Sequence, residues 1–236
     1  MTQSIQSPQH SLQWYRARLG KITGSRVGVI YGRGRGAEFS KTAFTYLHSV
    51  AAERMIPEEV VQSDELFSQY VAETDVTSRA MRIGSEREQE ARTLYSIISG
   101  FDVEEAPSFD HPEIPGFSSS PDGIVRDSGG DVAGALEIKC PSPHVYMEYL
   151  TKVQTPSDLR TYNPEYFWQC VAHIMVTGAL WCDFAVYNPF NREPLHVIRI
   201  NAEDEYISAL RPRIETALEY IDTLLAPFLV GETVKA

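Results

Sequence analysis

The chain has 236 residues, of which 43% are hydrophobic and 22% charged, a composition typical of one globular domain with a sizeable core. Its net charge of −11 argues against a general nucleic-acid coat, and no apolar run approaches the roughly 20 residues of a membrane span. Three cysteines without metal-site spacing favour a reduced, cytoplasmic protein that lacks disulfides. We therefore expect a single domain over residues 1–236.

The first hundred residues carry mainly helical signals. Apolar residues at helical spacing predict helices over residues 11–30, 42–55, 58–72 and 77–99. Pro57 separates the second helix from the third, and Gly100 is well placed to end the fourth. The segment 31–40 (YGRGRGAEFS) predicts a loop, because glycines alternate with arginines in it.

Basic residues are concentrated in residues 14–41. This segment holds seven basic residues and one acid, Glu38, so its local charge is +6 and the remainder of the chain carries −17. An acidic body with one basic segment fits an enzyme that grips a phosphate polymer at one place and holds metal with carboxylates elsewhere. The alternative is a solvated basic loop, because charge clusters are common on protein surfaces.

The second half of the chain changes to strand signals. Short strands are predicted over residues 103–110, 117–126, 132–140, 180–187 and 195–200. A helix is expected over 161–178, starting near Pro164, and an amphipathic helix should follow a cap at Asn201. Pro212 is expected to kink or restart that last helix. These elements together predict an α/β fold.

The motif with the clearest chemistry is SPDGIV (120–125) followed by LEIKC (136–140). Side chains alternate in a strand, so Glu137 and Lys139 share one face while Leu136 and Ile138 face the opposite layer. Asp122 supplies a second carboxylate, and a divalent cation between it and Glu137 would relieve their repulsion. The alternative for the strand is an ordinary cross-strand contact of Glu137 and Lys139.

Two further polar residues lie on predicted helices. Glu88 follows Gly84 by about one turn and precedes Ala91 by about one turn, so it sits on a face of small residues and can complete a cation shell. A salt bridge with Arg92 is the alternative. Gln169, in a Y-x-x-Q pattern, can orient water or phosphate, or it can be a hydrogen-bonded core amide. His173 is expected to be a buried, hydrogen-bonded histidine rather than a metal ligand.

The motifs G-x-x-x-E, S-P-D-G, L-E-I-K-C-P and Y-x-x-Q occur together in this order. The joint pattern resembles the lambda-type (YqaJ-like) phage recombination exonucleases, which belong to the PD-(D/E)xK nuclease superfamily. The resemblance begins at W-x-x-x-R-L-G-x-I-T-x-S, starting at Trp14, and ends near the terminal helix. It implies one nuclease domain over residues 1–236 with a central mixed β-sheet flanked by helices.

The resemblance also implies a mechanism. Mg²⁺, with Mn²⁺ as a substitute, is held by Glu88, Asp122, Glu137 and the Ile138 carbonyl, while Lys139 and Gln169 assist the attacking water. The implied activity is 5′-to-3′ digestion of one strand of linear duplex DNA, which leaves a 3′ single-stranded overhang for recombination. The implied assembly is a homotrimeric ring with a phage single-strand annealing protein as partner, in the bacterial cytoplasm. An endonuclease of the same superfamily and a non-catalytic DNA-end-binding module are the alternatives.

Contacts to the DNA itself are expected from other residues. Arg18, Ser25 and Ser120 are predicted to bind the 5′ phosphate, because arginine donates bidentate pairs and serines add single donors. The alternative is that Arg18 forms a surface ion pair and the serines cap helices. Arg33 and Arg35 of the basic segment are predicted to contact DNA. Met81, two turns before Glu88, is predicted to wedge between terminal bases, or else to pack in the core.

Overall fold

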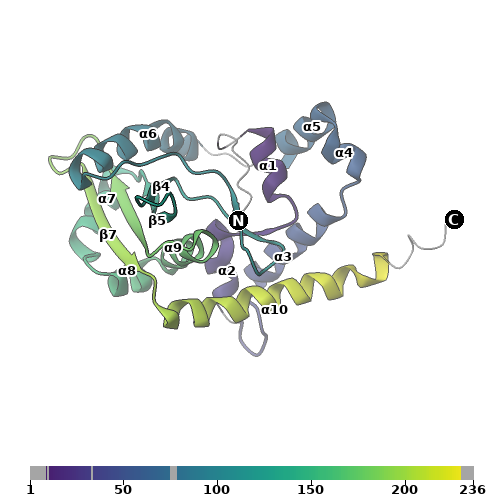
Figure 1. Cartoon of the computed structure of the whole chain (residues 1–236). Helices are drawn as coiled ribbons and strands as arrows, with labels where there is room; N and C mark the ends of the chain where they lie inside the picture. Colours follow the sequence, from purple (N-terminus) through teal and green to yellow (C-terminus); the bar gives the residue numbers. More distant parts are fainter. Residues whose placement is uncertain (1–8, 10, 33, 75–78, 230–236) are drawn as a thin grey trace.

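The computed structural model describes residues 9, 11–32, 34–74 and 79–229, and of residues 79–86 the backbone only. The early elements, in chain order, are α1 (Leu12–Arg18), η1 (Gly24–Arg26), α2 (Val27–Tyr31), α3 (Lys41–Arg54), α4 (Glu58–Gln62), α5 (Asp64–Thr74) and α6 (Arg79–Ser99). Helices α1, α4 and α5 lie to one side of a small sheet and α6 lies over it, while the long last helix runs below α9 (Pro164–Thr177), α2 and α3 (Figure 1). Gly100 ends α6 with a positive φ of 74°, as predicted.

The helix predicted over residues 11–30 is interrupted. Gly20 adopts a φ of 68°, and a side chain there would approach the Arg54 Cγ to 2.8 Å, so the chain leaves α1 and comes close to α3. Ile22 and Thr23 then form β1 (Ile22–Thr23) before the chain becomes helical again. The helix predicted over 58–72 is also divided, at Ser63, into α4 and α5.

The main sheet has four strands in the order β4-β5-β6-β7. Its strands are β4 (Gly123–Arg126), β5 (Val132–Lys139), β6 (Trp181–Tyr187) and β7 (Leu195–Asn201). β5 and β6 are parallel, whereas both outer pairs are antiparallel, so the sheet is mixed. Helix α6 packs on one face and α9 (Pro164–Thr177) on the other, which confirms a mixed sheet flanked by helices (Figure 1).

A second, three-stranded sheet was not predicted. Its order is β1-β3-β2, with β3 (Phe117–Ser119) between β1 and β2 (Phe109–Asp110). The single strand expected over 117–126 is therefore divided between two sheets. Pro121 explains the break, because it has no N–H to donate to a strand partner. Of the strand expected over 103–110, only the last two residues form β2, while Glu104 makes an isolated bridge to Ile124.

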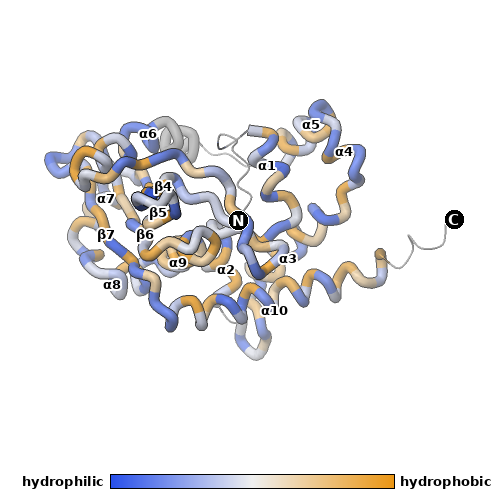
Figure 2. The backbone as a smooth tube through the Cα atoms, in the orientation of Figure 1, coloured by the Kyte–Doolittle hydropathy of each residue, from blue (hydrophilic) through white to orange (hydrophobic). Residues whose placement is uncertain are grey.

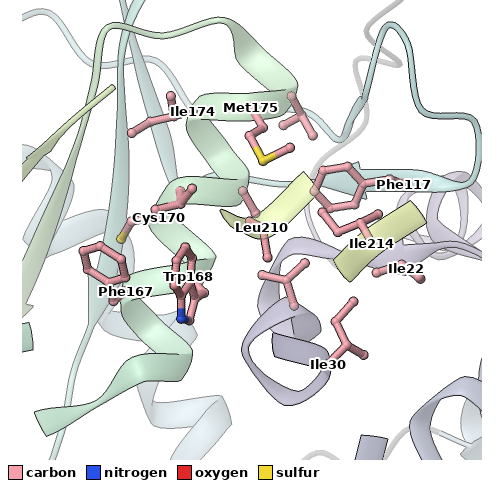
Figure 3. Close-up of a cluster of buried hydrophobic side chains, with 14 of the residues drawn as sticks. Ile22, Ile30, Phe117, Phe167, Trp168, Cys170, Ile174, Met175, Leu210 and Ile214 are labelled. Atoms are coloured by element: carbon pink, nitrogen blue, oxygen red, sulfur yellow. The ribbon is translucent and has the colours of Figure 1, made fainter. Parts of the chain in front are cut away.

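Helix α9 lies at the centre of the hydrophobic core. Asn163 caps it and Gly178 ends it with a φ of 72°, and all side chains from Phe167 to Met175 are buried. Figure 3 shows its side chains meeting residues from β1, α2, β3 and the last helix. Because α9 also covers the face of β5 that carries Glu137, it connects the core to the candidate site.

The C-terminal half contains three more helices. These are α7 (Pro143–Lys152), α8 (Pro156–Tyr162) and α10 (Asp204–Leu229). Hydrophobic and hydrophilic residues alternate along α10, whose buried stripe packs on α2, α3 and α9 (Figure 2). Helix α10 continues through Pro212, so the helix does not restart there, and Asn201 belongs to β7 rather than capping the helix. No helix in the described part of the chain is long and apolar enough to cross a membrane.

Candidate active site

Strand β5 divides its side chains between two layers. Leu136 and Ile138 pack with α6 residues in a small apolar cluster, whereas Glu137 faces α9 on the opposite side. Glu137 is 1% exposed, and Lys139 reaches it at the end of the strand with a hydrogen bond from Nζ to Oε1. The predicted alternation is therefore observed, and it places a charged pair inside the protein.

Asp122 lies at the break between the two sheets. Its N–H donates to the Leu136 carbonyl at 2.9 Å, and its Oδ2 accepts a hydrogen bond from the Ile138 N–H at 2.6 Å. Arg92 of α6, which is buried, donates Nε to the Asp122 carbonyl at 2.9 Å. These three bonds fix the carboxylate beside the segment of β5 that carries Glu137.

Glu137 has a second partner on α9. Its Oε2 accepts a hydrogen bond from His173 Nε2 at 2.7 Å, and His173 Nδ1 lies 2.8 Å from the Ser119 hydroxyl. In the tautomer that carries its hydrogen on Nε2, the ring donates to the carboxylate and Nδ1 accepts the Ser119 hydroxyl hydrogen. His173 is buried and hydrogen-bonded, as expected, but its partner is the central carboxylate of the candidate site.

The charges of this cluster alter one another. Burial raises the pKa of Asp122 well above its usual value, and repulsion from Glu137 and Glu88 raises it further. Burial alone would raise the pKa of Glu137 as well, but Lys139 and His173 together hold it below its usual value. Burial alone would lower the pKa of Lys139, but attraction to Glu137 and Asp122 raises it instead. Negative charge is therefore in excess around Asp122.

Glu88 belongs to the same electrostatic cluster. It is half-buried on α6, and its charge raises the pKa of Asp122 and, after the effect of burial, that of Cys140. Arg92, the alternative partner considered for Glu88, donates to Gln89 Oε1 at 2.6 Å as well as to the Asp122 carbonyl. Glu88 thus approaches Asp122 from the α6 side, while Glu137 approaches from β5.

The Y-x-x-Q pattern lines the same region. Tyr166 and Gln169 lie on α9, and Lys139 Nζ is 5.0 Å from the centre of the Tyr166 ring. Gln169 is buried one turn before His173, so both side chains lie on the face that meets β5. The structure therefore brings Lys139 and the Y-x-x-Q helix together.

The donor set fits a hard divalent cation. Every available donor is an oxygen atom, the ligand that Mg²⁺ prefers: the carboxylates of Asp122, Glu137 and Glu88 and the Ile138 carbonyl. A cation bound here would also offset the excess negative charge around Asp122. Among the described residues, no three His, Cys, Asp or Glu side chains are close enough together to hold a metal ion as they stand. Both Glu137 oxygens are bonded to other side chains, so binding of a cation requires Glu137 to share an oxygen with it.

Arg18 and Ser120 meet close to this cluster. Arg18 Nη1 donates to Ser120 Oγ at 3.0 Å, and its guanidinium lies 4.2 Å from the centre of the Trp14 ring. Burial lowers the pKa of Arg18 to about 10, which leaves it charged at neutral pH. Ser25 is exposed, with its hydroxyl 3.5 Å from Thr23 Oγ1. Two of the three predicted phosphate-binding residues are thus in direct contact.

The other predicted DNA contacts are described only in part. Arg35 is exposed in the 31–40 loop, while Arg33 and the side chain of Met81 lie outside the described residues. Two cations of the basic segment are paired with acids, Arg16 with Asp64 at 2.7 Å and Lys21 with Asp110 at 2.7 Å. The local positive charge is therefore smaller at the surface than the sequence alone indicates.

His173 and Arg92 are the functional candidates that the sequence did not single out as such. Each holds a carboxylate-bearing residue in place, through the Glu137 side chain and the Asp122 backbone respectively. A signal for both exists in the sequence, because each follows a predicted site residue by four positions on a helix. That spacing alone does not reveal which element the helix faces.

Known proteins with similar sequences and structures include nucleases. The family model of the YqaJ-like viral recombinase domain matches residues 13–180. No curated protein matches the chain. The crystal structure of an alkaline exonuclease (LHK-Exo) from Laribacter hongkongensis is 27% identical, with a TM-score of 0.73, and the match covers 92% of this chain and 96% of that one. The structure of LHK-Exo in complex with dAMP matches with the same values.

A more distant relative shares the fold. A phage-related exonuclease from Haemophilus somnus 129PT is 14% identical with a TM-score of 0.60, and the match covers 88% of this chain and 96% of that one. All site residues predicted from the sequence, as well as His173 and Arg92, fall within the range 13–180 that matches the family model. The match therefore includes the whole candidate site.

Proposed function

Because the chain belongs to the YqaJ-like viral recombinase domain family, we propose that it is a Mg²⁺-dependent exonuclease that degrades DNA from duplex ends. The observation that carries this proposal is the buried group of Asp122, Glu137 and Lys139, with Glu88 beside it, where negative charge exceeds positive. The similar structures of an alkaline exonuclease, alone and in complex with dAMP, support the same reaction.

The chain's own side chains have separate roles in this proposal. Asp122, Glu137, Glu88 and the Ile138 carbonyl hold Mg²⁺, for which Mn²⁺ can substitute. When bound, Mg²⁺ would neutralise negative charge on the phosphate and lower the pKa of the attacking water. Lys139, oriented by Glu137, donates a hydrogen bond to that water, and Gln169 orients it from α9. Arg92 and His173 act as positioning residues.

The 5′ end of the strand is the proposed point of attack. Arg18, Ser25 and Ser120 bind the terminal phosphate, and Ser120 is two residues from Asp122, so a bound 5′ phosphate fixes the distance to the first scissile bond. Each cleavage creates a new 5′ phosphate, which can occupy the same pocket. Digestion therefore runs 5′ to 3′ and leaves a 3′ single-stranded overhang for recombination.

Assembly and partners are part of the proposal. An acidic chain binds DNA weakly through phosphate contacts alone, and a ring around the duplex compensates for this, so we propose a homotrimer with Arg33 and Arg35 facing its channel. Met81 is proposed as the wedge that separates terminal bases. A phage single-strand annealing protein is the proposed partner for the overhang, in the cytoplasm of a bacterial host. Light scattering at micromolar protein tests the assembly, and a monomer mass would refute it.

One experiment separates this function from its alternatives. Linear duplex DNA with a 5′ phosphate, labelled at either the 5′ or the 3′ end, is incubated with the protein and Mg²⁺, beside a covalently closed circle. The proposal predicts early release of the 5′ label as mononucleotide, late loss of the 3′ label and an intact circle. Cleavage of the circle would indicate an endonuclease, and tight end binding without any cleavage would indicate a non-catalytic end-binding module.

A further inference from the structure

Arg213 is a buried arginine of α10 that takes no part in the candidate active site. It is 7% exposed, and its Nε and Nη2 both donate to the Ile30 carbonyl, at 3.2 and 2.9 Å. Nη2 also donates to the Glu38 carbonyl at 2.9 Å, and Nη1 pairs with the Glu38 carboxylate. The guanidinium lies 4.6 Å from the centre of the buried Phe39 ring. One side chain of α10 therefore joins Ile30, near the end of α2, to Glu38 on the other side of the loop that follows α2.

Residues 34–37 of this loop form a tight turn with Arg35 at its tip. Gly34 and Ala37 form an isolated antiparallel bridge, and Gly36 has a φ of 69°, a conformation that favours glycine. Arg35, between the two glycines, is exposed. A Cβ on Gly34 would approach the Phe39 carbonyl oxygen to 2.4 Å, so the turn packs directly on the residues that Arg213 contacts. The turn presents a basic side chain to solvent, and Arg213 holds its base.

Glu38 is the only acid in the basic segment 14–41, and it follows Arg35 by three positions. Its side chain is 54% exposed, so without a partner its charge would repel a phosphate chain and attract the Arg35 guanidinium. The ion pair with Arg213 offsets this charge. Burying an arginine is costly unless its donors are satisfied, and here Ile30 and Glu38 satisfy them. Arg213 thus supports the turn and also neutralises the acid beside it.

We propose that Arg213 is a positioning residue for DNA binding: it holds the 34–37 turn so that Arg35 contacts a backbone phosphate, and it prevents Glu38 from competing for Arg35. This inference rests on the proposed function, in which Arg35 faces the DNA. Arg213 acts through Arg35 and touches no DNA itself, because it is buried. It lies on α10, beyond the range 13–180 that matches the family model, so the inference adds the last helix to the DNA-binding part of the chain.

The salt dependence of DNA binding reports the number of phosphate contacts and therefore tests this role. Affinity for a 5′-phosphorylated duplex is measured by fluorescence anisotropy between about 50 and 200 mM salt, in EDTA to prevent cleavage. Arg35→Ala and Arg213→Gln should each weaken binding about tenfold and lower the salt slope by about 1. The double variant should bind no more weakly than either, because both changes remove the same contact. Arg211→Ala, at a half-exposed arginine of α10 that pairs with Glu113 and Glu215, is the matched control and should bind like wild type.

A second change, at Glu38, separates positioning from structural support. Adding Glu38→Gln to Arg213→Gln removes the carboxylate that the first change leaves unpaired, so affinity should recover about two- to fivefold. A residue that only stabilises the fold predicts no recovery, which would overturn the inference. If Arg213→Gln does not fold, Arg213→Lys replaces it. Arg213→Lys keeps a positive charge beside Glu38 and should retain the wild-type salt slope, and a lowered slope in the folded variant would overturn the inference.

The same measurements distinguish failure of this inference from failure of the proposed function. A folded Arg213→Gln with the wild-type salt slope, or a loss of affinity that adds fully to that of Arg35→Ala, would overturn the role of Arg213 alone. An Arg35→Ala variant that binds like wild type would overturn the inference while nucleotide release still supports the nuclease. Wild type that neither binds duplex ends nor releases nucleotides would overturn the proposed function and this inference together.

Discussion

Replacing His173 by alanine removes the side chain that connects the candidate metal-binding carboxylate to the small sheet. The change breaks the 2.7 Å hydrogen bond to Glu137 and the 2.8 Å contact with Ser119, and it leaves a space beside a carboxylate that is 1% exposed. Glu137 then retains Lys139 as its described partner. We expect the carboxylate to lose its fixed orientation as well as part of its stabilisation.

The size of the effect follows from this burial. Removing one partner of a buried charged group costs about 3–5 kcal/mol, and since Glu137 keeps Lys139 we expect the lower value, about 3 kcal/mol. For a chain of this length, that lowers the melting temperature by about 6–12 °C. Loss of a group that orients a metal ligand typically reduces metal affinity or activity by about 10–100-fold. His173→Gln keeps a donor for Glu137 and an acceptor for Ser119, so it should recover part of both losses.

Calorimetry gives the change in stability, and titration of Mg²⁺ in a nucleotide-release assay gives the change in function. At a temperature where all variants are folded, His173→Ala should require about 10–100-fold more Mg²⁺ for half-maximal rate than wild type, and His173→Gln should lie between them. If His173→Ala melted earlier but kept the wild-type Mg²⁺ requirement and rate, His173 would be a core histidine only, and its proposed positioning role would be refuted.

Other substitutions probe the supports of the site. Gly24→Ala would place its Cβ 1.8 Å from the Ser119 hydroxyl oxygen, so it should destabilise the protein by about 1–3 kcal/mol. Urea unfolding measures this loss, and an unchanged unfolding midpoint would contradict the close approach of η1 to β3. Arg92→Ala removes the hydrogen-bond donor to the Asp122 carbonyl and should lower the rate of nucleotide release by about 10–100-fold. A folded variant that releases nucleotides at the wild-type rate would exclude a role for Arg92 in positioning Asp122.

Periodicity predicted the regular elements well where neighbouring residues alone decide the structure. The strands at 132–140, 180–187 and 195–200 and the helix starting at Pro164 lie within one or two residues of β5, β6, β7 and α9. The Asp122 and Glu137 motif predicted which face of β5 is charged, because alternation is a local property of strands. The close approach of both carboxylates was expected from the same pattern.

The structure differs from the sequence-based predictions where contacts between distant residues determine the local conformation. Residues 22–23 were predicted to be part of a helix. They form β1 instead, because they pair in parallel with Phe117 and Ser118 of β3, which lie more than ninety positions away in the sequence. The strand expected over 117–126 divides at Pro121, and each part joins a different sheet. The role of His173 depends on the packing of α9 against β5, a tertiary contact that no local pattern contains. Helices α7 and α8, over a stretch without a clear motif, were not predicted.

The central claim is that Asp122 belongs to a metal-dependent catalytic centre rather than to a DNA-binding surface. Asp122→Asn keeps the size of the side chain and an oxygen to accept the Ile138 N–H, so the variant should fold and bind 5′-phosphorylated duplex ends nearly as wild type does. The direct measurement is nucleotide release from such an end, with Mg²⁺ and with EDTA, for both proteins at equal end occupancy. We predict release by wild type only, and only with Mg²⁺; release by Asp122→Asn at the wild-type rate, or release by wild type in EDTA, would contradict the account.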